Sequence, residues 1–573
     1  MNTNINNTLL SLTIVSQCLA CQPKNQEADN TSKKTKPLNV VFILSDDHRY
    51  DYMGFMHTIP WLETPNMDRM AKEGAHIKNA FVTTSLSSPS RASILTGMYS
   101  HSHKVVDNSA PLPEGLVFFP QYLQESGYKT AFFGKWHMGN DSGAPQPGFD
   151  HWEGFKGQGE YYNPGINVNG EWIQYKDSTY VTDLLTDHAI QFMKEQKQAD
   201  KPFFVYLSHK GVHDNFSAAK RHKDCYKDKE LVLPPNFNTP HYGIKELPTI
   251  DKKTGKAAFG KEYYGEKMAP DWVKSQRESW HGVDYSYHGR PWDVQVRKYC
   301  ETLRSVDESI GSVLDYLKEA GLDDNTLVIY MGDNGFAWGE HGLIDKRQFY
   351  EESVRVPMLV RCPSMFEGGK VIENMVQNVD VAPTIMACAG LEKAEQMVGY
   401  SFLPLLKGEK VNWRDHIFYE YYWEYEFPQT PTMHGIRTDR YKYIRYHGVW
   451  DTNEFYDLQN DPYETTNLIA EPEYKEILGI APVGFKAVNT DYRLNLEGFE
   501  EVGKQVAKLV PRCRKMFLEL RNSLSANHNL LAAVLYSDGS LKHTGIYDIT
   551  HEVDRVGTGD AFVGGLIYGL LTY

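Results

Sequence analysis

The sequence predicts an α/β protein with a mixed, mostly parallel sheet flanked by helices, and a smaller antiparallel sheet subdomain toward the C-terminus. Short continuous apolar runs such as Val40–Leu44 and Leu327–Met331 are typical of strands buried on both faces. Helical patterns separate these runs along the chain. After about residue 410 the pattern changes to tyrosine-rich alternating stretches, Ile417–Tyr422 and Ile436–Tyr446, which indicate the smaller sheet.

The elements of the large sheet can be placed in order. A glycine just after the last helical residue marks a helix end, and Gly74, Gly127 and Gly321 take that place here. The expected strands are Val40–Leu44, Thr130–Phe133, Phe203–Leu207 and Leu327–Met331. The expected helices are Pro65–Lys72, Phe119–Ser126, Val181–Gln196 and Val294–Ala320. This alternation predicts parallel strands joined by helical connections.

The composition excludes several classes of protein. Of 573 residues, 41% are hydrophobic and 23% are charged, which permits a large core and excludes disorder of the whole chain. The net charge of −14 excludes a nucleic-acid partner held by a general basic field. No run of about 18 apolar residues is present, so the sequence predicts no membrane span. The seven cysteines are scattered, and neither a disulfide scaffold nor a zinc cluster is expected.

The first 36 residues have the composition of a targeting segment. Thr8–Cys21 is a short apolar stretch that ends in small residues and cysteine, and the polar stretch Gln22–Lys36 follows it. This order is typical of a bacterial export signal. A signal of the lipoprotein type would place a lipid anchor on Cys21. We therefore expect an exported protein that is periplasmic or anchored in the outer membrane.

Acidic side chains follow two of the expected strands. Asp46 and Asp47 come directly after the first strand, and Asp333 and Asn334 come directly after Leu327–Met331. In an open α/β sheet, groups at the carboxyl ends of strands converge on one crevice. Three carboxylates and an amide oxygen form an all-oxygen site, which suits Ca²⁺ or Mg²⁺. Each pair taken alone is equally well explained as a solvated loop acid or a helix cap.

Lysine and histidine side chains lie in three further segments, two of which follow expected strands. Lys135 and His137 follow Thr130–Phe133, the phrase Ser208–His213 follows Phe203–Leu207, and Lys346 lies beyond the second acidic pair. Taken singly, these side chains are well explained as solvated loop residues. Taken together with a hard-metal site, they suit a tetrahedral anionic ester as the ligand.

A serine motif completes this set. The motif runs from Ser87 through Pro89 and Ser90 to Arg91 and is followed by Leu95–Gly97. From residue 37 to residue 478 the chain thereby resembles the formylglycine-dependent sulfatases of the alkaline-phosphatase-like superfamily. The resemblance implies that a radical-type maturation enzyme oxidises Ser87 to Cα-formylglycine. An aldehyde hydrates to a gem-diol, so one hydroxyl can attack sulfur and the other can expel sulfate, whereas a plain serine sulfate would be hard to hydrolyse.

The same resemblance implies a role for each site residue. The Ca²⁺ ligands, with Mg²⁺ as the alternative cation, would be Asp46, Asp47, Ser87 in its hydrated form, Asp333 and Asn334. The catalytic residues would be Ser87, Arg91, Lys135, His137, His213 and Lys346. In that family the lysines clamp the sulfate oxygens, while the arginine and the first histidine orient the hydrate. His213 would protonate the leaving alkoxide, with His209 as the second choice.

The substrate is less well defined. The aromatic segments Ser279–Trp292 and Tyr421–Thr432 suit rim loops that stack on sugar faces, or ordinary core packing. The resemblance favours a carbohydrate sulfate in an oligo- or polysaccharide. An ulvan-like sulfated uronate polymer is one candidate, which the likeness of the last part of the chain to a sugar kinase suggests. Two alternatives stay open. One is a phosphodiester or phosphonate hydrolase of the same superfamily, and the other is a non-catalytic glycan-binding lipoprotein in which Ser87 is unmodified.

The last part of the chain has a different character. Asp554–Asp560 and the stretches before it resemble the ribokinase-like sugar kinases, most closely 2-keto-3-deoxygluconate kinase. The resemblance implies an anion hole at Gly557–Gly559 and a base at Asp560, but other parts of that family have no counterpart, so no kinase activity is expected. The chain thus divides into an export segment 1–36, a catalytic domain 37–410, a small antiparallel subdomain 411–478 and a kinase-like segment 479–573.

Overall fold

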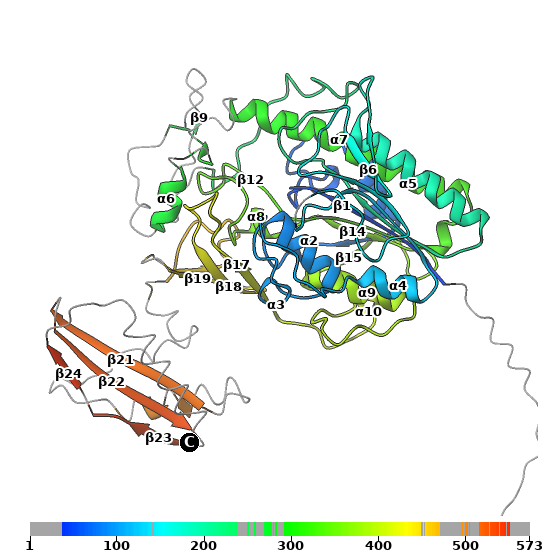
Figure 1. The fold of residues 1–573 in the computed structure, drawn as a ribbon. Helices are drawn as coiled ribbons and strands as arrows, with labels where there is room; N and C mark the ends of the chain where they lie inside the picture. The colour runs from blue at the N-terminus through cyan, green and yellow to red at the C-terminus, as the bar shows by residue number, and fades with distance from the viewer. Residues whose placement is uncertain are drawn as a thin grey trace, which may run out of the picture.

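The structure is a computed structural model that describes most of the chain between residues 37 and 550 (Figure 1). The described residues are 37–139, 142–237, 249–250, 257–258, 269–277, 279, 281–283, 291–448, 451, 453–469, 471, 496, 499–501, 503–504, 515–525, 528–537, 539–545 and 547–550. The export segment 1–36 with Cys21, and the kinase-like motif Asp554–Asp560, lie outside the described residues.

A ten-stranded sheet in the order β15-β2-β14-β11-β1-β8-β4-β5-β6-β7 forms the centre of the molecule. Its strands are β1 (Asn39–Ser45), β2 (Ala75–Ile77), β4 (Lys129–Lys135), β5 (His151–Phe155), β6 (Gly165–Val168), β7 (Glu171–Gln174), β8 (Phe203–Ser208), β11 (Thr326–Gly332), β14 (Met358–Arg361) and β15 (Lys370–Ile372). The central run from β11 to β5 is parallel throughout. Antiparallel pairing joins β14 to both of its neighbours and forms the β5-β6-β7 edge. The prediction of a mixed, mostly parallel sheet is confirmed.

Helices cover both faces of this sheet. Figure 1 shows α5 and α7 on one side, and α2, α4, α9 and α10 on the other. The helices are α1 (Pro65–Glu73), α2 (Ser87–Thr96), α3 (Ser100–His103), α4 (Phe119–Glu125), α5 (Val181–Gln198), α6 (Asp271–Arg277), α7 (Trp292–Glu319), α8 (Glu351–Val354), α9 (Val381–Cys388) and α10 (Leu403–Leu406). Strand β1 divides its buried side chains between the two resulting cores: Val40, Phe42 and Leu44 belong to one, Val41 and Ile43 to the other. This burial on two faces explains why its apolar run is continuous.

The long helix α7 contacts three other segments through polar side chains. The Tyr299 hydroxyl donates to the Asp47 carbonyl oxygen over 2.7 Å. The Asp307 carboxylate accepts the backbone N–H of Met67 at 2.8 Å and so caps the first turn of α1. Ser309 Oγ lies 2.9 Å from His209 Nε2. One helix therefore connects the segment after β1, the start of α1 and the segment after β8.

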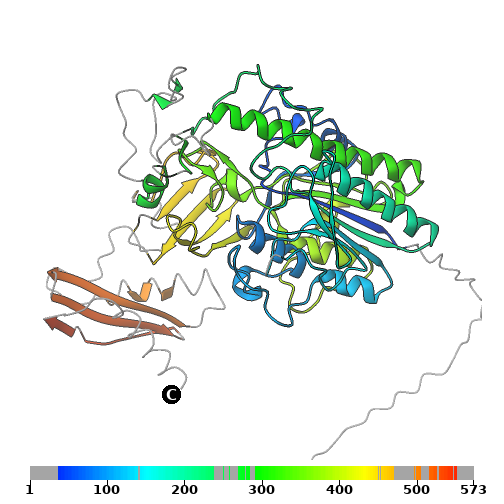
Figure 2. The same ribbon diagram turned by 45° about the horizontal axis from the view of Figure 1, so that its top comes forward.

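Two further sheets follow the large one in the chain. The antiparallel sheet β17-β18-β19-β20 is the predicted smaller sheet and is seen in yellow in Figure 2. Its strands are β17 (His416–Tyr421), β18 (Thr432–Thr438), β19 (Tyr441–His447) and β20 (Glu454–Asp457). Another antiparallel sheet is formed by β21 (Lys515–Ser525), β22 (His528–Ser537), β23 (Ser540–His543) and β24 (Tyr547–Thr550). Short strand pairs complete the fold: β3 (Ala80–Phe81) with β16 (Val376–Gln377), β12 (Ala337–Trp338) with β13 (Ile344–Asp345), and β9 (Thr249–Ile250) with β10 (Ala257–Ala258).

The carboxyl ends of four central strands meet at one edge of the large sheet. Ser45 at the end of β1 pairs with Gly332 at the end of β11. Ser208 at the end of β8 lies in register with Leu44 on one side and Gly134 on the other. The segments that carry the predicted acidic and basic residues therefore begin side by side, as expected for a crevice at the ends of parallel strands. Among the described residues, no helix is long and apolar enough to cross a membrane.

Candidate active site

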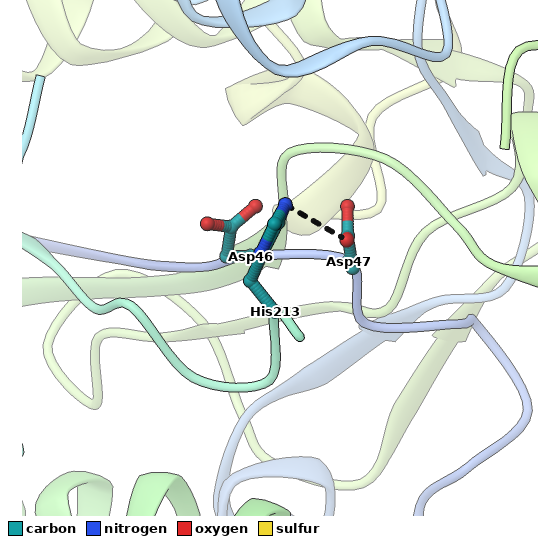
Figure 3. A group of neighbouring side chains, drawn as sticks. All are labelled: Asp46, Asp47 and His213. Atoms are coloured by element: carbon teal, nitrogen blue, oxygen red, sulfur yellow. Dashed lines mark ion pairs between the residues drawn. The ribbon is translucent and has the colours of Figure 1, made fainter. Parts of the chain in front are cut away.

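Three carboxylates lie together where β1 and β11 end. Asp46, Asp47 and Asp333 are all buried. Asp333 Oδ1 accepts the backbone N–H of Asp47 at 3.0 Å, and the Asn334 side-chain amide donates to Asp47 Oδ1 over 2.7 Å. Figure 3 shows the imidazole of His213 beside the two aspartates that follow β1, with Nε2 at 3.7 Å from Asp47 Oδ2. The four residues predicted from the two acidic pairs are therefore brought into one cluster.

Ser87 begins helix α2 at the edge of this cluster. Its Oγ lies 3.3 Å from Asp46 Oδ1 and 3.5 Å from Lys135 Nζ. The helix is fully buried and ends at Gly97, whose φ of 67° is the left-handed conformation that glycine adopts without strain. The Ser-x-Pro-Ser-Arg motif and the following Leu-Thr-Gly are thus one short helix that fixes the serine against the carboxylates.

Arg91 lies one turn farther along α2 and is fully engaged by its neighbours. Its Nε and Nη2 donate to Asp333 Oδ2 over 3.0 and 2.8 Å. Nη1 donates to Ser208 Oγ over 2.7 Å and to the Lys135 carbonyl oxygen over 2.8 Å. Its guanidinium is 3.9 Å from the Asp46 carboxylate. These contacts make Arg91 the residue that joins α2 to the ends of β4, β8 and β11, beyond the role in orienting a nucleophile that the sequence implies.

The two predicted lysines pair with the two aspartates that follow β1. Lys135 Nζ donates to Asp46 Oδ2, and Lys346 Nζ donates to Asp47 Oδ1. Both ammonium groups are almost completely buried. Buried charges are retained when they are paired and hydrogen-bonded. The cluster therefore balances three carboxylates with three cations, the third being Arg91.

Burial and neighbouring charges shift the pKa values of these acids in opposite directions. Burial would raise the pKa of Asp46, but Lys135 and the other cations of the cluster hold that pKa well below its ordinary value. Burial raises the pKa of Asp47 to about 7 against the opposing charge of Lys346. Burial, together with the charge of Asp46, also raises the pKa of Asp333. An added cation would lower the raised values and favour the ionised acids.

The surroundings lower the pKa values of the two predicted histidines. Burial and then the charge of Lys135 lower the pKa of His137 well below its ordinary value. Burial and then the charge of Lys346 do the same for the pKa of His213. Both His137 and Asp47 have positive φ angles, 53° and 57°, and such strained conformations of non-glycine residues cluster at functional sites.

The donor set fits a hard divalent cation. Ligand atoms of Asp46, Asp47 and His213 lie within 4.8 Å of one another. The Asn334 Oδ1 atom is buried and has no hydrogen-bond partner in the described part of the chain, although its amide nitrogen donates to Asp47. A buried acceptor without a partner calls for an ion or a water molecule. Carboxylate and amide oxygens are the ligands that Ca²⁺ and Mg²⁺ prefer.

Comparison with protein families decides the assignment. Residues 38–391 match the family model described as Sulfatase. The chain belongs to the sulfatase family. Residues 339–480 of this sulfatase also match the model described as N-sulphoglucosamine sulphohydrolase, C-terminal. The family predicted from the serine motif is therefore confirmed.

Individual relatives extend over most of the sulfatase chain. The N-acetylglucosamine-6-O-sulfatase of Bacteroides thetaiotaomicron is 34% identical over 511 residues, covering 83% of this chain and 89% of the relative. The ulvan-active sulfatase of Formosa agariphila is 25% identical over 488 residues, covering 82% and 84%. A solved structure of a protein in complex with its substrate D-glucosamine-2-N,6-O-disulfate has a TM-score of 0.66 and 30% sequence identity. That match covers 83% of this chain and 99% of the solved one.

Two histidines of the sulfatase lie outside the cluster. His209, the second choice for the acid, is fully buried, and its Nε2 faces Ser309 of α7. His341 is stacked on Tyr350 with ring centroids 3.9 Å apart, and its Nε2 is 3.9 Å from Glu352. His213 is therefore the histidine of the β8 segment that faces the carboxylates.

The sequence analysis missed two residues that contact the predicted ones, Gln158 and Tyr161. Gln158 Nε2 lies 3.0 Å from His137 Nε2. Tyr161 donates its hydroxyl to the His213 carbonyl oxygen over 2.6 Å, and the ammonium of Lys210 lies over the Tyr161 ring at 4.8 Å. Gln158 and Tyr161 follow β5 directly, so the rule that functional groups follow parallel strands would have included them.

The aromatic segment Tyr421–Thr432 is anchored to the segment that carries Lys346. Glu424 accepts from Arg347 Nε at 2.8 Å, and the Arg347 guanidinium lies 3.5 Å from the centroid of the Phe427 ring. Trp423 and Tyr425 are 47% and 87% exposed. The segment therefore combines core packing with exposed rings, and stacking of those rings on sugar faces stays a prediction. The other aromatic segment, Ser279–Trp292, lies mostly outside the described residues.

Proposed function

We propose that this sulfatase hydrolyses sulfate esters on carbohydrates. The observation that carries the proposal is the contact of Ser87 Oγ with Asp46 and Lys135, two members of a cluster of three buried carboxylates and three buried cations. The relatives support a sugar substrate: one is an N-acetylglucosamine-6-O-sulfatase, and the structural neighbour was solved with D-glucosamine-2-N,6-O-disulfate. A sulfated amino sugar is therefore the first candidate, and an ulvan-like uronate polymer is the second.

The proposed cofactors are a divalent cation and a formylglycine at residue 87, and side chains of the cluster would surround both. Asp46, Asp47, Asp333 and Asn334, together with residue 87, would hold Ca²⁺, or Mg²⁺ in its place. Such a cation polarises sulfate oxygens and lowers the pKa of a bound hydroxyl. Oxidation of the Ser87 hydroxymethyl group to an aldehyde would give Cα-formylglycine, whose hydrate is a reactive nucleophile that can later expel sulfate.

The remaining side chains then have distinct tasks. Lys135 and Lys346 would bind two sulfate oxygens and neutralise the charge that develops on them. Arg91 holds Asp333 and the backbone of β4 in place. His137 would take a proton from residue 87, and His213 would donate one to the oxygen of the leaving sugar. The bond that breaks is the one between sulfur and that oxygen.

We infer that the enzyme acts outside the cytoplasm after maturation. The apolar stretch Thr8–Cys21 and the polar stretch after it support export, and Cys21 is the proposed lipid-anchor residue. A relative named an extracellular sulfatase homolog, from Drosophila melanogaster, is compatible with this location. A formylglycine-generating radical enzyme is the proposed maturation partner.

A panel of esters tests the proposed function. Purified enzyme would be incubated with 6-O-sulfated glucosamine derivatives, ulvan oligosaccharides, 4-nitrophenyl sulfate and matched phosphate mono- and diesters, and free sulfate and phosphate would be measured. We expect the highest kcat/KM on a sulfated sugar. Preference for a phosphodiester would favour the alternative hydrolase, and binding of glycans without turnover by matured enzyme would favour the non-catalytic reading.

Replacing His213 by alanine should affect poor leaving groups most. An alkoxide needs a proton as it departs, whereas 4-nitrophenolate leaves without one. We expect His213→Ala to lower kcat/KM on a sugar sulfate by about 10²–10⁴-fold, with a much smaller loss on 4-nitrophenyl sulfate. His209→Ala is the matched control, because His209 faces Ser309. A leaving-group effect in His209→Ala and none in His213→Ala would reverse the assignment.

A further inference from the structure

We propose that Lys210 is a positioning residue of the sulfatase reaction, whose buried ammonium group holds the backbone carbonyl to which the ring of His213 is anchored. The inference rests on the role proposed above for His213. Lys210 Nζ donates to the Asp214 carbonyl oxygen over 3.1 Å, and His213 Nδ1 lies 3.0 Å from the same oxygen. A carbonyl oxygen has two lone pairs and can accept both hydrogen bonds.

The contact at Nδ1 leaves the other ring nitrogen of His213 for the proposed proton transfer. A carbonyl oxygen only accepts hydrogen bonds, so Nδ1 is the donor and carries a proton. Nε2 faces the cluster, 3.7 Å from Asp47 Oδ2. In the cationic ring that acts as the acid, the proton on Nε2 passes to the oxygen of the leaving sugar as the bond from that oxygen to sulfur breaks, and the proton on Nδ1 stays hydrogen-bonded to the Asp214 carbonyl. The negative charge of a bound sulfate ester favours this cationic form.

Tyr161 contacts the same turn at two points. Its hydroxyl donates to the His213 carbonyl oxygen over 2.6 Å, and the Lys210 ammonium lies 4.8 Å from the centroid of its ring, within the range of a cation–π contact. Tyr161 is itself fixed, because the Val181 N–H at the start of α5 donates to its carbonyl oxygen over 2.9 Å. His213 is therefore held through two successive carbonyl oxygens, its own and that of Asp214.

The start of this turn is tied to the strand end that carries the aspartates. The Asp46 N–H donates to the Gly211 carbonyl oxygen over 2.9 Å, and the Val212 N–H donates to the Asp46 carbonyl oxygen over 2.7 Å. The His213 N–H then donates to the Lys210 carbonyl oxygen over 2.9 Å. Lys210 thus closes the turn with its backbone carbonyl and with its ammonium group, so its side chain helps to set where the ring of His213 lies.

The surroundings of Lys210 favour this task over a packing role. The residue is only 3% exposed, and burial lowers the pKa of Lys210 to about 8. Burying an ammonium group costs free energy that an apolar side chain of similar length would not cost. Lys135 and Lys346 donate to carboxylates of the cluster, whereas Lys210 donates to the carbonyl beside His213.

Variants of the two supporting residues test this role through the leaving group. Lys210→Met keeps an apolar stem but removes the charge and the hydrogen bond, and Tyr161→Phe removes only the hydroxyl. Because both residues act through the acid, we expect Lys210→Met to lower kcat on a sulfated sugar by up to about 10²-fold, with KM and the kcat on 4-nitrophenyl sulfate little changed. Tyr161→Phe should show the same selective loss to a smaller extent. Lys223, an exposed lysine farther along the segment, provides the control, since Lys223→Met should leave kcat on both esters unchanged.

A measurement independent of turnover completes the test. In a crystal structure of Lys210→Met we expect the Asp214 carbonyl oxygen to be displaced from His213 Nδ1, and a retained contact would overturn the inference. Equal losses of kcat on both esters, a raised KM with kcat unchanged, or no loss on the sugar would also overturn it. A displaced carbonyl in a protein whose parent enzyme hydrolyses no sulfated sugar would support the positioning by Lys210 and count instead against the proposed function.

Discussion

Replacing Ser87 by alanine is expected to lower kcat on a sulfated sugar by about 10⁶-fold, because removal of a catalytic nucleophile has an effect of this size. Ser87 lies at the first turn of α2 with its Oγ as its only functional group, so the variant should keep the fold. The measurement is sulfate release by the two proteins, prepared in parallel from a host that matures serine-type sites, with circular dichroism as the check on folding.

The chemical state of Ser87 decides how that loss is interpreted. In the active protein the tryptic peptide of residues 79–91 should be lighter than its sequence by two hydrogens and should react with a hydrazine. Ser87→Cys offers a matched variant, since cysteine sites are substrates of the oxygen-dependent maturation enzyme. Expressed with that enzyme in air, Ser87→Cys should be active while the serine protein is not. Full activity of a protein with unmodified Ser87 would contradict the proposed nucleophile.

Removal of the proposed cation should have the second-largest effect. Chelation should abolish sulfate release, because it removes the cation that polarises the sulfate and that Asp46, Asp47 and Asp333 would hold. It should also lower the free energy of unfolding by about 2.7 kcal/mol, the linkage expected for a ligand present at about 100 times its Kd. The measurements are residual activity and Tm after dialysis against a chelator, followed by addition of Ca²⁺ or Mg²⁺.

A variant pair links this effect to the assigned ligands. Asn334→Ala removes the amide oxygen that has no partner in the described chain and should raise the Ca²⁺ concentration needed for half-maximal activity. Asn325→Ala removes a surface amide that bonds to the Pro37 carbonyl oxygen and should leave that concentration unchanged. If a chelator saturated with Ca²⁺ inhibited as strongly as the free chelator, the loss would have another cause.

Much of the fold and of the cluster could be predicted because both depend on local pattern. A continuous apolar run of one strand's length predicts burial on two faces, and β1 and β11 have it. Acidic pairs directly after such runs must lie at strand ends, which parallel pairing brings together. The predicted elements therefore differ from the observed ones by about one or two residues at their ends, as is usual for helix boundaries.

The remainder depends on contacts that no local pattern reveals. Ile436–Tyr446 reads as one alternating stretch, but the structure breaks it into β18 and β19 at Asp439 and Arg440. His209 and His213 belong to one phrase, and the sequence names His213 as the acid only through the family resemblance. The contact of His209 with Ser309 of α7 and the approach of His213 to Asp47 depend on tertiary packing. Gln158 lies 21 residues from its partner His137, and nothing in the spacing of the two residues announces the contact.

Helix α7 links three segments around the candidate site, and this linkage affects how the enzyme should unfold. Tyr299, Asp307 and Ser309 lie on one helix, and the ten residue steps from the first to the last span about 15 Å at the rise of an α-helix. They hold the turn of Asp47, the start of α1 and the segment that leads to His213 in place. We expect that none of these three segments unfolds locally while helix α7 is intact. On heating, the enzyme should therefore lose activity at the same temperature at which the whole fold unfolds, and not at a lower temperature through local unfolding of the active site.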